Sequence, residues 1–324
     1  MKLQQIKYLV GIVSNDLNVS KTADKFFTSQ PGVSRQIKLL EEELNVDIFE
    51  RNGRLLTGLT PVGNAILDMA SEVLDRVNNI KSVAKEFSGE ISGKLTIATT
   101  HTQARYVLPR TIMHFTNMHE SVGFHLKQGN PYQAFEMVSK GMVDFAIASE
   151  AMDDFSNLII FPCYSWNRLV LVKRDHPLAS GAPITLEQLS KYPLVTYENG
   201  FSGRYQLNNA FQKAGLEPTI MLTASDADII KAYVKMDLGV GVIASVAYDP
   251  DDDCDLVSID VRELFDDCVA KIAIRKGVSL RSYMYDFIEI FSPHLSRDIV
   301  ERTLAKPSSE EVFSIMHKLD IPHY

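Results

Sequence analysis

Cysteine is scarce in this chain, which has only three in 324 residues, and they lie far apart. No CxxC pair and no cysteine–histidine spacing typical of zinc ligands occurs, so the sequence indicates neither a disulfide framework nor a metal site. No apolar run approaches membrane-spanning length, and polar side chains interrupt the first residues where an export signal would be apolar. We therefore expect a cytoplasmic protein with no membrane partner.

A strong excess of basic charge is also absent. The formal net charge is −8, and the length suggests two or three domains with full cores. Residues 1–60 hold eight basic and seven acidic side chains, a net charge of +1, which leaves −9 for the rest. Only this first segment is a plausible polyanion binder, and we expect its non-specific DNA affinity to be modest and to benefit from dimerisation.

Residues 18–61 contain the pattern of a helix-turn-helix. A first helix is predicted from Val19, with Ala23, Phe26 and Phe27 on its buried face. The second helix opens on hydroxyl side chains that can cap it and on a proline suited to a first turn. Apolar residues at helical spacing are then expected to face a core: Val33, Ile37, Leu40 and Leu44.

The start and polar face of the second helix are the predicted DNA-reading surface. In a helix-turn-helix this helix enters the major groove. The residues assigned to DNA binding here are Thr28, Ser29, Gln30, Pro31, Ser34, Arg35 and Lys38.

A basic hairpin is predicted directly after these helices. Two short strands flank Asn52-Gly53, a strong hairpin signal because both central residues are expected to take positive φ. Arg51 and Arg54 flank the turn, as in a wing that lays cations against the DNA backbone or minor groove. The alternative is a plain three-helix core with ordinary solvated arginines, but the order of the elements favours a winged helix-turn-helix.

Residues 61–88 are predicted to form one long linker helix, with Thr60 as its cap. An amphipathic helix packed on its own domain is one interpretation. We favour a seam between the subunits of a homo-oligomer, because two seven-residue series are almost entirely apolar. They are Val62, Met69, Arg76, Val83 and Ile66, Val73, Ile80, Phe87. A Ser/Gly-rich linker follows.

The remaining two-thirds alternates short apolar strands with helices, which predicts mostly parallel α/β units. The predicted strands are residues 94–99, 122–128, 143–149, 169–173, 194–196, 220–223 and 241–244. Ligands of such sheets bind outside the carboxyl ends of the strands.

Hydroxyl and amide side chains follow four of these strands, and no lysine or arginine is obvious among them. Each could merely cap a helix, but four together favour a site where neutral dipoles hold a small anion such as a carboxylate or sulfate. The residues are Thr100, Thr102, Gln103, Ser149 and Ser202, together with residues 224–226.

An enzyme is not indicated. Gly239–Ala244 matches a dinucleotide-binding pattern, but a predicted helix precedes it and a strand follows, which is the reverse of the required order. His101 has no nucleophile and orienting partner to form a catalytic set, so we assign no catalytic residue and no cofactor. Trp166 could belong to the core or to the wall of the anion site. The runner-up is an α/β enzyme or solute-binding module with an accessory DNA-binding domain.

The N-terminal segment resembles the LysR-type transcriptional regulators. The resemblance implies a winged helix-turn-helix, a linker helix and a two-lobed α/β effector domain like a periplasmic binding protein. It extends over nearly the whole chain to a subgroup that controls cysteine biosynthesis and sulfate assimilation, or sulfonate use in a paralogous branch. The blocks THTQAR and PCYSWNR, at residues 100–105 and 162–168, are specific to this subgroup.

This resemblance implies a cytoplasmic activator, a homotetramer or dimer that binds promoter DNA and contacts RNA polymerase. Its inducer would be N-acetylserine, formed from O-acetylserine, and sulfate could occupy the same site. The matching effector-binding positions are Thr100, Thr102, Gln103, Ser149, Trp166 and Ser202. The subgroup has threonine where Ser149 and Ser202 stand, so the hydroxyl is kept and a methyl group is lost.

The expected domains follow from these elements and from the resemblance. Residues 1–60 are the DNA-binding domain, 61–88 the linker helix and 89–292 the effector domain. Within the effector domain, lobe I is 89–164 with 268–292, and lobe II is 165–267. A helical tail is expected over 293–324.

Overall fold

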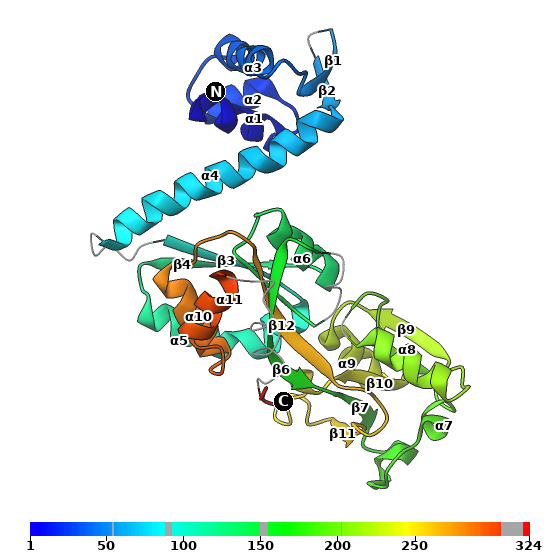
Figure 1. Ribbon diagram of the computed structural model, residues 1–324. Helices are drawn as coiled ribbons and strands as arrows, with labels where there is room; N and C mark the ends of the chain where they lie inside the picture. Colours follow the sequence, from blue (N-terminus) through cyan, green and yellow to red (C-terminus); the bar gives the residue numbers. More distant parts are fainter. Residues whose placement is uncertain (54, 88–92, 150–154, 202, 306–319) are drawn as a thin grey trace. The chain divides into compact units, whose positions relative to one another are not determined.

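The computed structural model describes residues 1–53, 55–87, 93–149, 155–201, 203–305 and 320–324 (Figure 1). The chain divides into two compact units, Met1–Glu90 and Ile91–Tyr324. Across these ranges no helix is both long enough and apolar enough to cross a membrane.

The first unit consists of three short helices, a hairpin and one long helix. They are α1 (Leu3–Ser14), α2 (Val19–Lys25), α3 (Gln30–Leu44), β1 (Phe49–Asn52), β2 (Leu55–Leu59) and α4 (Pro61–Phe87). Asn18, Ser29 and Thr60 each accept a hydrogen bond from the backbone N–H three residues later, which caps α2, α3 and α4. The predicted helix-turn-helix, hairpin and long helix are therefore confirmed.

The core of this unit is close to the prediction, with two corrections. Ala23 is buried and Phe26 packs against the core, but Phe27 is 98% exposed. The prediction for Phe27 is wrong because α2 ends at Lys25 and the following turn puts Phe27 in a left-handed conformation, φ +51°, facing solvent.

Leu44 is the second correction. Val33, Ile37 and Leu40 are fully buried as predicted, whereas Leu44 is 38% exposed. It is the last residue of α3, and the left-handed Asn45 then turns the chain away. Helical spacing alone therefore extends the buried face by one residue too many.

The hairpin turn begins one residue later than predicted. Asn52 still pairs with Leu55, so Gly53 is the first residue of the loop. Gly53 has φ +62°, and Asn52 is not left-handed. The expectation of positive φ at both Asn52 and Gly53 is wrong because strand pairing continues through Asn52.

Helix α4 has two apolar faces. One face packs on the core of the first unit through Ile66, Leu67, Ala70 and Leu74. Beside it runs the α4 stripe, an exposed row that consists of Val62 (41%), Met69 (67%), Val73 (39%) and Ile80 (70%). Ile66 of the predicted seam therefore packs on the core of its own unit, whereas the described residues of that unit do not cover the stripe. The side chains of Val83 and Phe87 lie outside the described part.

The second unit has two lobes. The sheet of lobe I has the strand order β4-β3-β5-β12-β6. Its strands are β3 (Gly93–Thr99), β4 (Val122–Gln128), β5 (Phe145–Ala148), β6 (Leu158–Trp166) and β12 (Cys268–Arg275). A π-helical turn (Gln103–Val107) leads into α5 (Leu108–Met118), and α6 (Pro131–Ser139), α10 (Ser282–Phe291) and α11 (Arg297–Ala305) complete the lobe.

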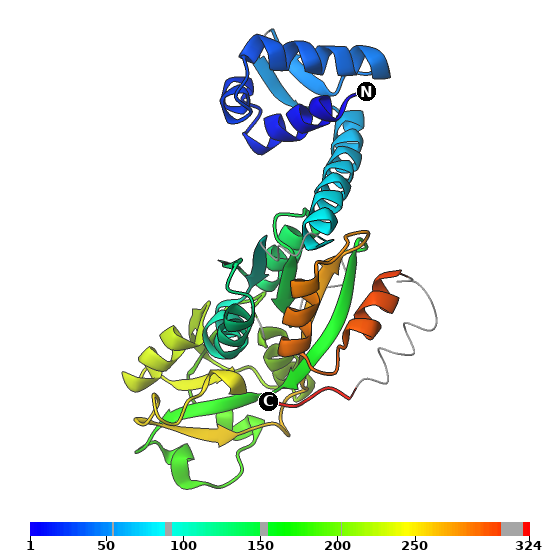
Figure 2. The ribbon, with the colours of Figure 1, turned by 90° about the vertical axis from the view of Figure 1, so that its left-hand side faces the viewer.

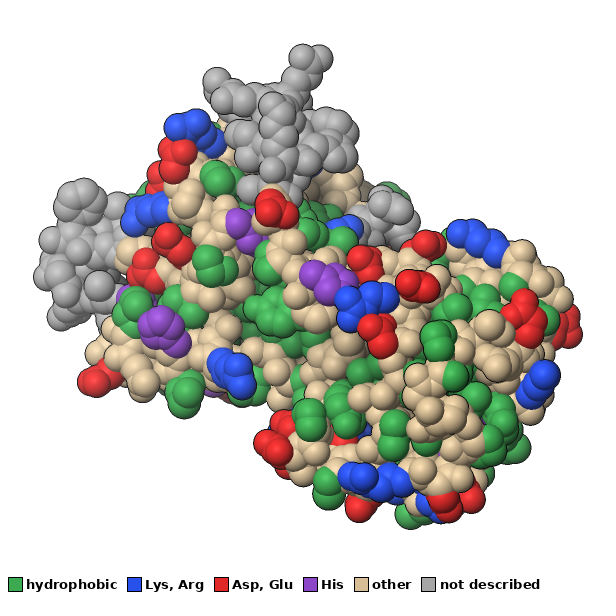
Figure 3. Space-filling model, turned by 90° about the horizontal axis from the view of Figure 1, so that it is seen from below, with side chains coloured by type: hydrophobic (Ala, Val, Ile, Leu, Met, Phe, Trp, Pro, Cys, Tyr) green, Lys and Arg blue, Asp and Glu red, His purple; other side chains and the backbone are tan. Residues whose placement is uncertain are grey.

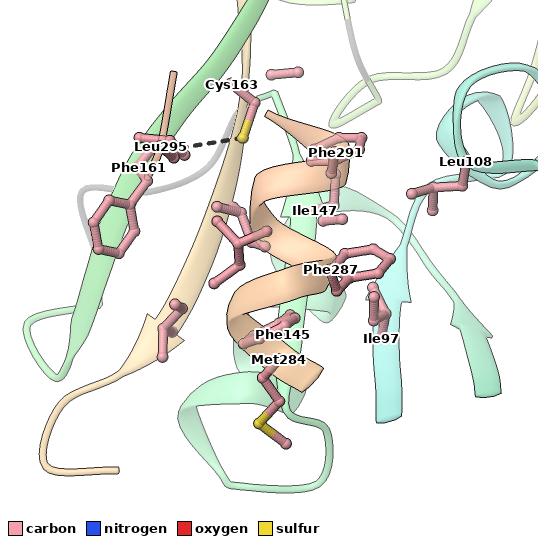
Figure 4. Packing of buried hydrophobic residues seen from close by; sticks show 14 of the residues in the cluster. Ile97, Leu108, Phe145, Ile147, Phe161, Cys163, Met284, Phe287, Phe291 and Leu295 are labelled. Atoms are coloured by element: carbon pink, nitrogen blue, oxygen red, sulfur yellow. Dashed lines mark hydrogen bonds between the residues drawn. The ribbon is translucent and has the colours of Figure 1, made fainter. Parts of the chain in front are cut away.

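Helix α10 lies against this sheet and supplies much of the lobe I core. Phe287 and Phe291 project from it toward Ile97, Phe145 and Ile147 of the strands (Figure 4). All of these side chains belong to one buried cluster, so the cluster fixes the strands whose ends carry the predicted effector residues.

The sheet of lobe II has the order β11-β7-β10-β8-β9. Its strands are β7 (Arg168–Lys173), β8 (Leu194–Tyr197), β9 (Ile220–Ala224), β10 (Val240–Ala244) and β11 (Leu256–Asp260). The helices are α7 (Leu186–Leu189), α8 (Arg204–Lys213) and α9 (Ala227–Lys235), with 3₁₀ turns at Pro177–Ser180 and Ser245–Ala247. Gly239 lies between α9 and β10, where a Cβ atom would come within 2.3 Å of the Pro193 carbonyl oxygen. This close backbone approach explains a glycine here without any dinucleotide.

The prediction of mostly parallel sheets is only partly correct. In lobe I, β3 pairs parallel with β4 and β5, and in lobe II, β8 pairs parallel with β9 and β10. The pairs that involve β6, β7, β11 or β12 are antiparallel. The reason is the double crossing between lobes. The chain leaves lobe I along β6 and returns along β12, which is green beside orange in Figure 2.

The two crossings are joined at Asn167. Strand β6 continues in the lobe I sheet to Trp166, two residues beyond the predicted lobe boundary at Tyr164. The Asn167 amide then donates to the Phe265 carbonyl (3.0 Å) and to Asp267 (2.7 Å) on the returning segment. One side chain therefore ties the outgoing chain to the returning chain.

The C-terminal segment returns to this crossing. The predicted helical tail is helical over α11, and residues 320–324 run beside β6. Ser165 donates its backbone N–H to Pro322 (2.8 Å) and accepts one from Tyr324 (2.9 Å). The Tyr324 ring lies 4.8 Å from that of Tyr164.

Candidate functional site

The polar face of α3 is exposed, and its Arg35 has no partner among the described residues. Ser29 caps the helix, Gln30 donates to Ser34 (3.0 Å) and Lys38 lies 3.6 Å from Glu42. Arg35 is exposed and makes no hydrogen bond or ion pair with the other described residues. Its guanidinium is therefore free to form the bidentate contact that guanine favours.

The predicted wing cation Arg51 has a structural role as well. Its guanidinium lies 2.6 Å from Glu41, a buried carboxylate on α3 that also accepts the backbone N–H groups of Ile48 (2.9 Å) and Phe49 (3.2 Å). Glu41 thus holds the first wing strand against the recognition helix. Arg54 lies outside the described residues.

Five of the six predicted effector residues are described, and all five are buried. They are Thr100, Thr102, Gln103, Ser149 and Trp166. Ser202 lies outside the described residues. Thr100 and Ser149 follow β3 and β5, two paired strands whose carboxyl ends lie side by side. We refer to this region, between the strand ends of lobe I and lobe II, as the interlobe site.

The Thr100 hydroxyl is the informative atom of the interlobe site. Thr100 is 3% exposed, and its Oγ1 has no hydrogen-bond partner. A buried polar atom without a partner costs roughly 1–3 kcal/mol, so such an atom in a folded protein calls for an explanation. A ligand that accepts this hydroxyl proton would provide one.

The other side chains are already joined in pairs. Tyr164 donates its hydroxyl to Oε1 of Gln103 (2.5 Å), and the Trp166 indole N–H donates to Oγ of Ser149 (2.9 Å). The side chain of Thr102 hydrogen-bonds Tyr197 of lobe II, and burial raises the pKa of that tyrosine to about 12. Thr102 thus connects the two lobes directly.

Acidic and basic groups near the interlobe site neutralise one another. Asp228, in the first turn of α9, lies 3.8 Å from Arg105 and 3.9 Å from His101 and hydrogen-bonds Tyr106, all three from lobe I. With Asp226 these groups bring one histidine and two carboxylates together. Because Arg105 already faces Asp228, the arrangement suits an ion pair between lobes better than a cation site.

The buried cations of this unit are also occupied. Among the described residues, Arg168 donates to the Gly203 carbonyl (3.0 Å) and Arg204 donates to the Tyr197 carbonyl (2.8 Å). Lys231 forms an ion pair with Asp253 (2.6 Å). On the face drawn in Figure 3, the described acidic and basic side chains are interspersed. The buried cations among the described residues therefore already have partners within the protein.

Sequence reasoning did not identify Tyr164 and Tyr197 as part of this region. Tyr197 ends β8, one residue beyond the predicted strand, and it could have been found by extending the search for strand-end residues. Tyr164 lies within β6, a strand that the sequence pattern did not predict, so no local signal marked it.

Both units match described families. Residues 3–64 match "Bacterial regulatory helix-turn-helix protein, lysR family", and residues 88–296 match "LysR substrate binding domain". The chain is 47% identical to the HTH-type transcriptional regulator CysB of Haemophilus influenzae, over 93% of each chain. It is 44% identical to SsuR of Burkholderia cenocepacia, over 91% of this chain and 96% of the relative. It is 38% identical to the regulator Cbl of Escherichia coli K12, over 96% and 99%.

Solved structures agree with this assignment. The cofactor-binding domain of the Cbl transcriptional regulator matches with a TM-score of 0.64 and 38% identity, over 66% of this chain and 94% of that domain. A full-length OxyR variant from Pseudomonas aeruginosa matches with a TM-score of 0.69 over 90% of this chain and 97% of that one. At 22% identity, the second likeness supports the fold alone.

Proposed function

Because this chain belongs to the LysR family of DNA-binding transcriptional regulators, which are not enzymes, we propose that it activates genes of cysteine biosynthesis and sulfate assimilation. The proposal includes a small effector with a carboxylate group, N-acetylserine or its precursor O-acetylserine, in the interlobe site. Sulfate can occupy the same place. The subgroup-specific blocks at residues 100–105 and 162–168 support this interpretation, as does the identity to CysB.

One observation carries the effector part of the proposal. The buried Thr100 hydroxyl lacks a partner at a position where parallel strands end and a helical segment begins. Fixed hydroxyl, amide and helix-terminal N–H dipoles can replace the hydration shell of a compact anion without a neighbouring cation. N-Acetylserine suits such a site because it carries a carboxylate, an amide and a hydroxyl.

Calorimetric titration of the full-length protein tests the effector. N-Acetylserine, O-acetylserine, sulfate and adenosine phosphosulfate are titrated separately. Saturable binding of N-acetylserine that sulfate displaces supports the proposal. Binding of adenosine phosphosulfate alone would contradict N-acetylserine as the effector, and binding of none of the four would contradict an anion effector of this kind.

The DNA-reading face is tested by Arg35→Ala. We expect promoter affinity to fall by about 1–3 kcal/mol, with relaxed specificity at one base pair, if Arg35 contacts a guanine bidentately. A gel-shift titration measures this change. Arg35→Lys is the matched control, because it keeps the charge and loses the planar fork, and it should retain non-specific binding but not the specificity. Unchanged promoter binding by Arg35→Ala would show that the recognition surface lies elsewhere.

We also propose that the α4 stripe is the seam of a homodimer, from which a tetramer could be built. Val73→Glu is expected to weaken self-association by tenfold or more, because a seam would bury an unpaired carboxylate. Asn64→Glu places the same charge on the opposite, exposed side of α4 and should have no effect. Sedimentation velocity measures the mass of each variant. An unchanged mass for Val73→Glu would leave α4 as a helix that serves only its own domain.

The proposed activator would contact RNA polymerase in addition to promoter DNA. This part of the proposal rests on the resemblance to the family subgroup. Transcription in vitro with purified polymerase tests it, and stimulation that requires N-acetylserine is the expected result.

A further inference from the structure

We infer that Tyr164 and Trp166 are positioning residues of the interlobe site, which orient the hydrogen-bonding groups of Gln103 and Ser149 so that both face the effector as donors. The inference rests on the proposed function of that site. It concerns specificity, because it explains how neutral side chains select an anion over a neutral or cationic ligand.

Amide and hydroxyl side chains do not favour an anion by themselves. A glutamine amide carries an acceptor oxygen and a donor nitrogen, and a serine hydroxyl can donate or accept. An anion is stabilised by the donor form of each group and repelled by the acceptor form. A site built from such residues therefore needs something that decides which form faces the ligand.

Tyr164 fixes the orientation of the Gln103 amide. Its hydroxyl is buried and donates to Oε1 of Gln103 at 2.5 Å, which occupies the acceptor end of the amide. Burial also raises the pKa of Tyr164 well above its usual range, so the hydroxyl keeps the proton that it donates. The N–H groups at the other end of the amide are then the ones directed away from Tyr164.

Trp166 fixes the orientation of the Ser149 hydroxyl in the same way. An indole N–H can only donate, and here it donates to Oγ of Ser149 at 2.9 Å. The hydroxyl proton of Ser149 must therefore point in another direction. Both Ser149 and Trp166 are buried, so bulk water does not compete for these groups.

Tyr164 and Trp166 lie two residues apart at the end of β6, so strand alternation puts them on the same face. The ladder between β6 and β12 shifts register at this point, since Tyr164 pairs with Ala270 but Pro162 pairs with Lys271, which leaves Cys163 as the extra residue of a β-bulge. A bulge re-aims the side chains that follow it. Cys163 packs in the lobe I core next to Phe161 (Figure 4), and after the bulge Tyr164 and Trp166 make the hydrogen bonds to Gln103 and Ser149.

The end of β6 is held rigidly between its neighbours. Ser165, between the two positioning residues, exchanges backbone hydrogen bonds with Pro322 (2.8 Å) and Tyr324 (2.9 Å). The ring centroid of Tyr164 lies 4.8 Å from that of Tyr324 and 6.1 Å from that of Phe291. A donor that is fixed in this way can impose its polarity on Gln103, whereas a mobile one could follow the amide as it flips.

Double-mutant cycles test the inference, with inorganic sulfate as the probe and calorimetric affinity as the readout. The first cycle uses Tyr164→Phe, Gln103→Ala and the double variant in the full-length protein. We expect each single variant to bind sulfate about tenfold more weakly, and the double variant to match Gln103→Ala. This lack of additivity is expected because Tyr164 acts only through the amide.

The second cycle uses Trp166→Phe, Ser149→Ala and their combination, with the same expectation. Ser149→Thr keeps the hydroxyl and should bind sulfate as the original chain does. Tyr132→Phe, at an exposed tyrosine of the same lobe, is the control for loss of a phenol group and should change nothing. Thermal unfolding of each variant is measured alongside.

The outcomes distinguish the positioning role of Tyr164 and Trp166 from the existence of the effector site. A merely structural role for Tyr164 and Trp166 would give multiplicative losses of affinity, about a hundredfold in each double variant, together with a lowered melting temperature. That result, or unchanged sulfate affinity in Tyr164→Phe and Trp166→Phe, overturns the positioning role while leaving the anion site intact. If the original chain binds neither sulfate nor N-acetylserine, the proposed effector site and the positioning role both fail.

Discussion

Asp253→Ala is expected to lower the free energy of unfolding of the second unit by about 3–5 kcal/mol. Asp253 and Lys231 are both almost completely buried, and their charged atoms lie 2.6 Å apart. Removing the carboxylate would leave the ammonium group of Lys231 buried without its counter-charge. It would also remove the acceptor for the backbone N–H of Asp249, which Asp253 binds at 3.1 Å.

The loss is measured by urea unfolding followed through the fluorescence of Trp166, the single tryptophan of the chain. Asp266→Ala is the matched control, because its carboxylate lies 3.6 Å from Lys213 in a pair that is largely exposed, and such pairs contribute little. Lys231→Met in the Asp253→Ala background should recover much of the stability, since no unpaired charge then remains. A loss under about 1 kcal/mol for Asp253→Ala would show that Lys231 finds water or another partner.

Thr100→Val is expected to weaken effector binding by roughly tenfold or more and to abolish the transcriptional response to N-acetylserine. Valine keeps the shape of threonine and removes only the hydroxyl. A hydrogen bond to a charged group contributes about 1.5–3 kcal/mol, which sets the size of the effect. DNA binding and self-association should be unchanged, because Thr100 belongs to a different unit from α3 and α4.

The stability of the ligand-free protein supplies a second measurement on the same variant. The Thr100 hydroxyl has no internal partner, so its removal should leave the melting temperature unchanged or raise it. Thr116→Val, whose hydroxyl bonds only to the backbone of its own helix, is the control and should leave effector affinity unchanged. A normal response to N-acetylserine in Thr100→Val would place the effector elsewhere.

Much of the architecture could be predicted because it follows from local chemistry. The caps at Asn18, Ser29 and Thr60, and the helical spacing of apolar residues, are contained within a few neighbouring positions. The strands that end at Thr99 and Ala148 were likewise visible as short apolar runs. The polar residues after them were candidate ligands for the same reason, since parallel strands present their carboxyl ends together.

The wrong predictions have a different cause. The spacing of apolar residues shows which residues share a face of a helix, but it does not show where the chain turns away from the core. Phe27 and Leu44 fit an apolar helical spacing, but a left-handed residue at or just after each turns the chain away from the core. Strands β6 and β12 were missed because the reason for their existence is a crossing between two lobes, and this is a property of the whole fold.

The helix-turn-helix, the long helix and the α/β unit with hydroxyl-rich strand ends could all be predicted from the amino-acid sequence, and the resemblance in its motifs indicated the LysR family. The pairing of the polar groups, in contrast, depends on the folded arrangement of the two lobes. Tyr164 meets Gln103 across 61 positions of sequence, Trp166 meets Ser149 across 17, and Lys231 meets Asp253 across 22. Hydrogen bonds and ion pairs reach only a few ångströms, so such partners are chosen where the packed strands and helices bring distant residues together.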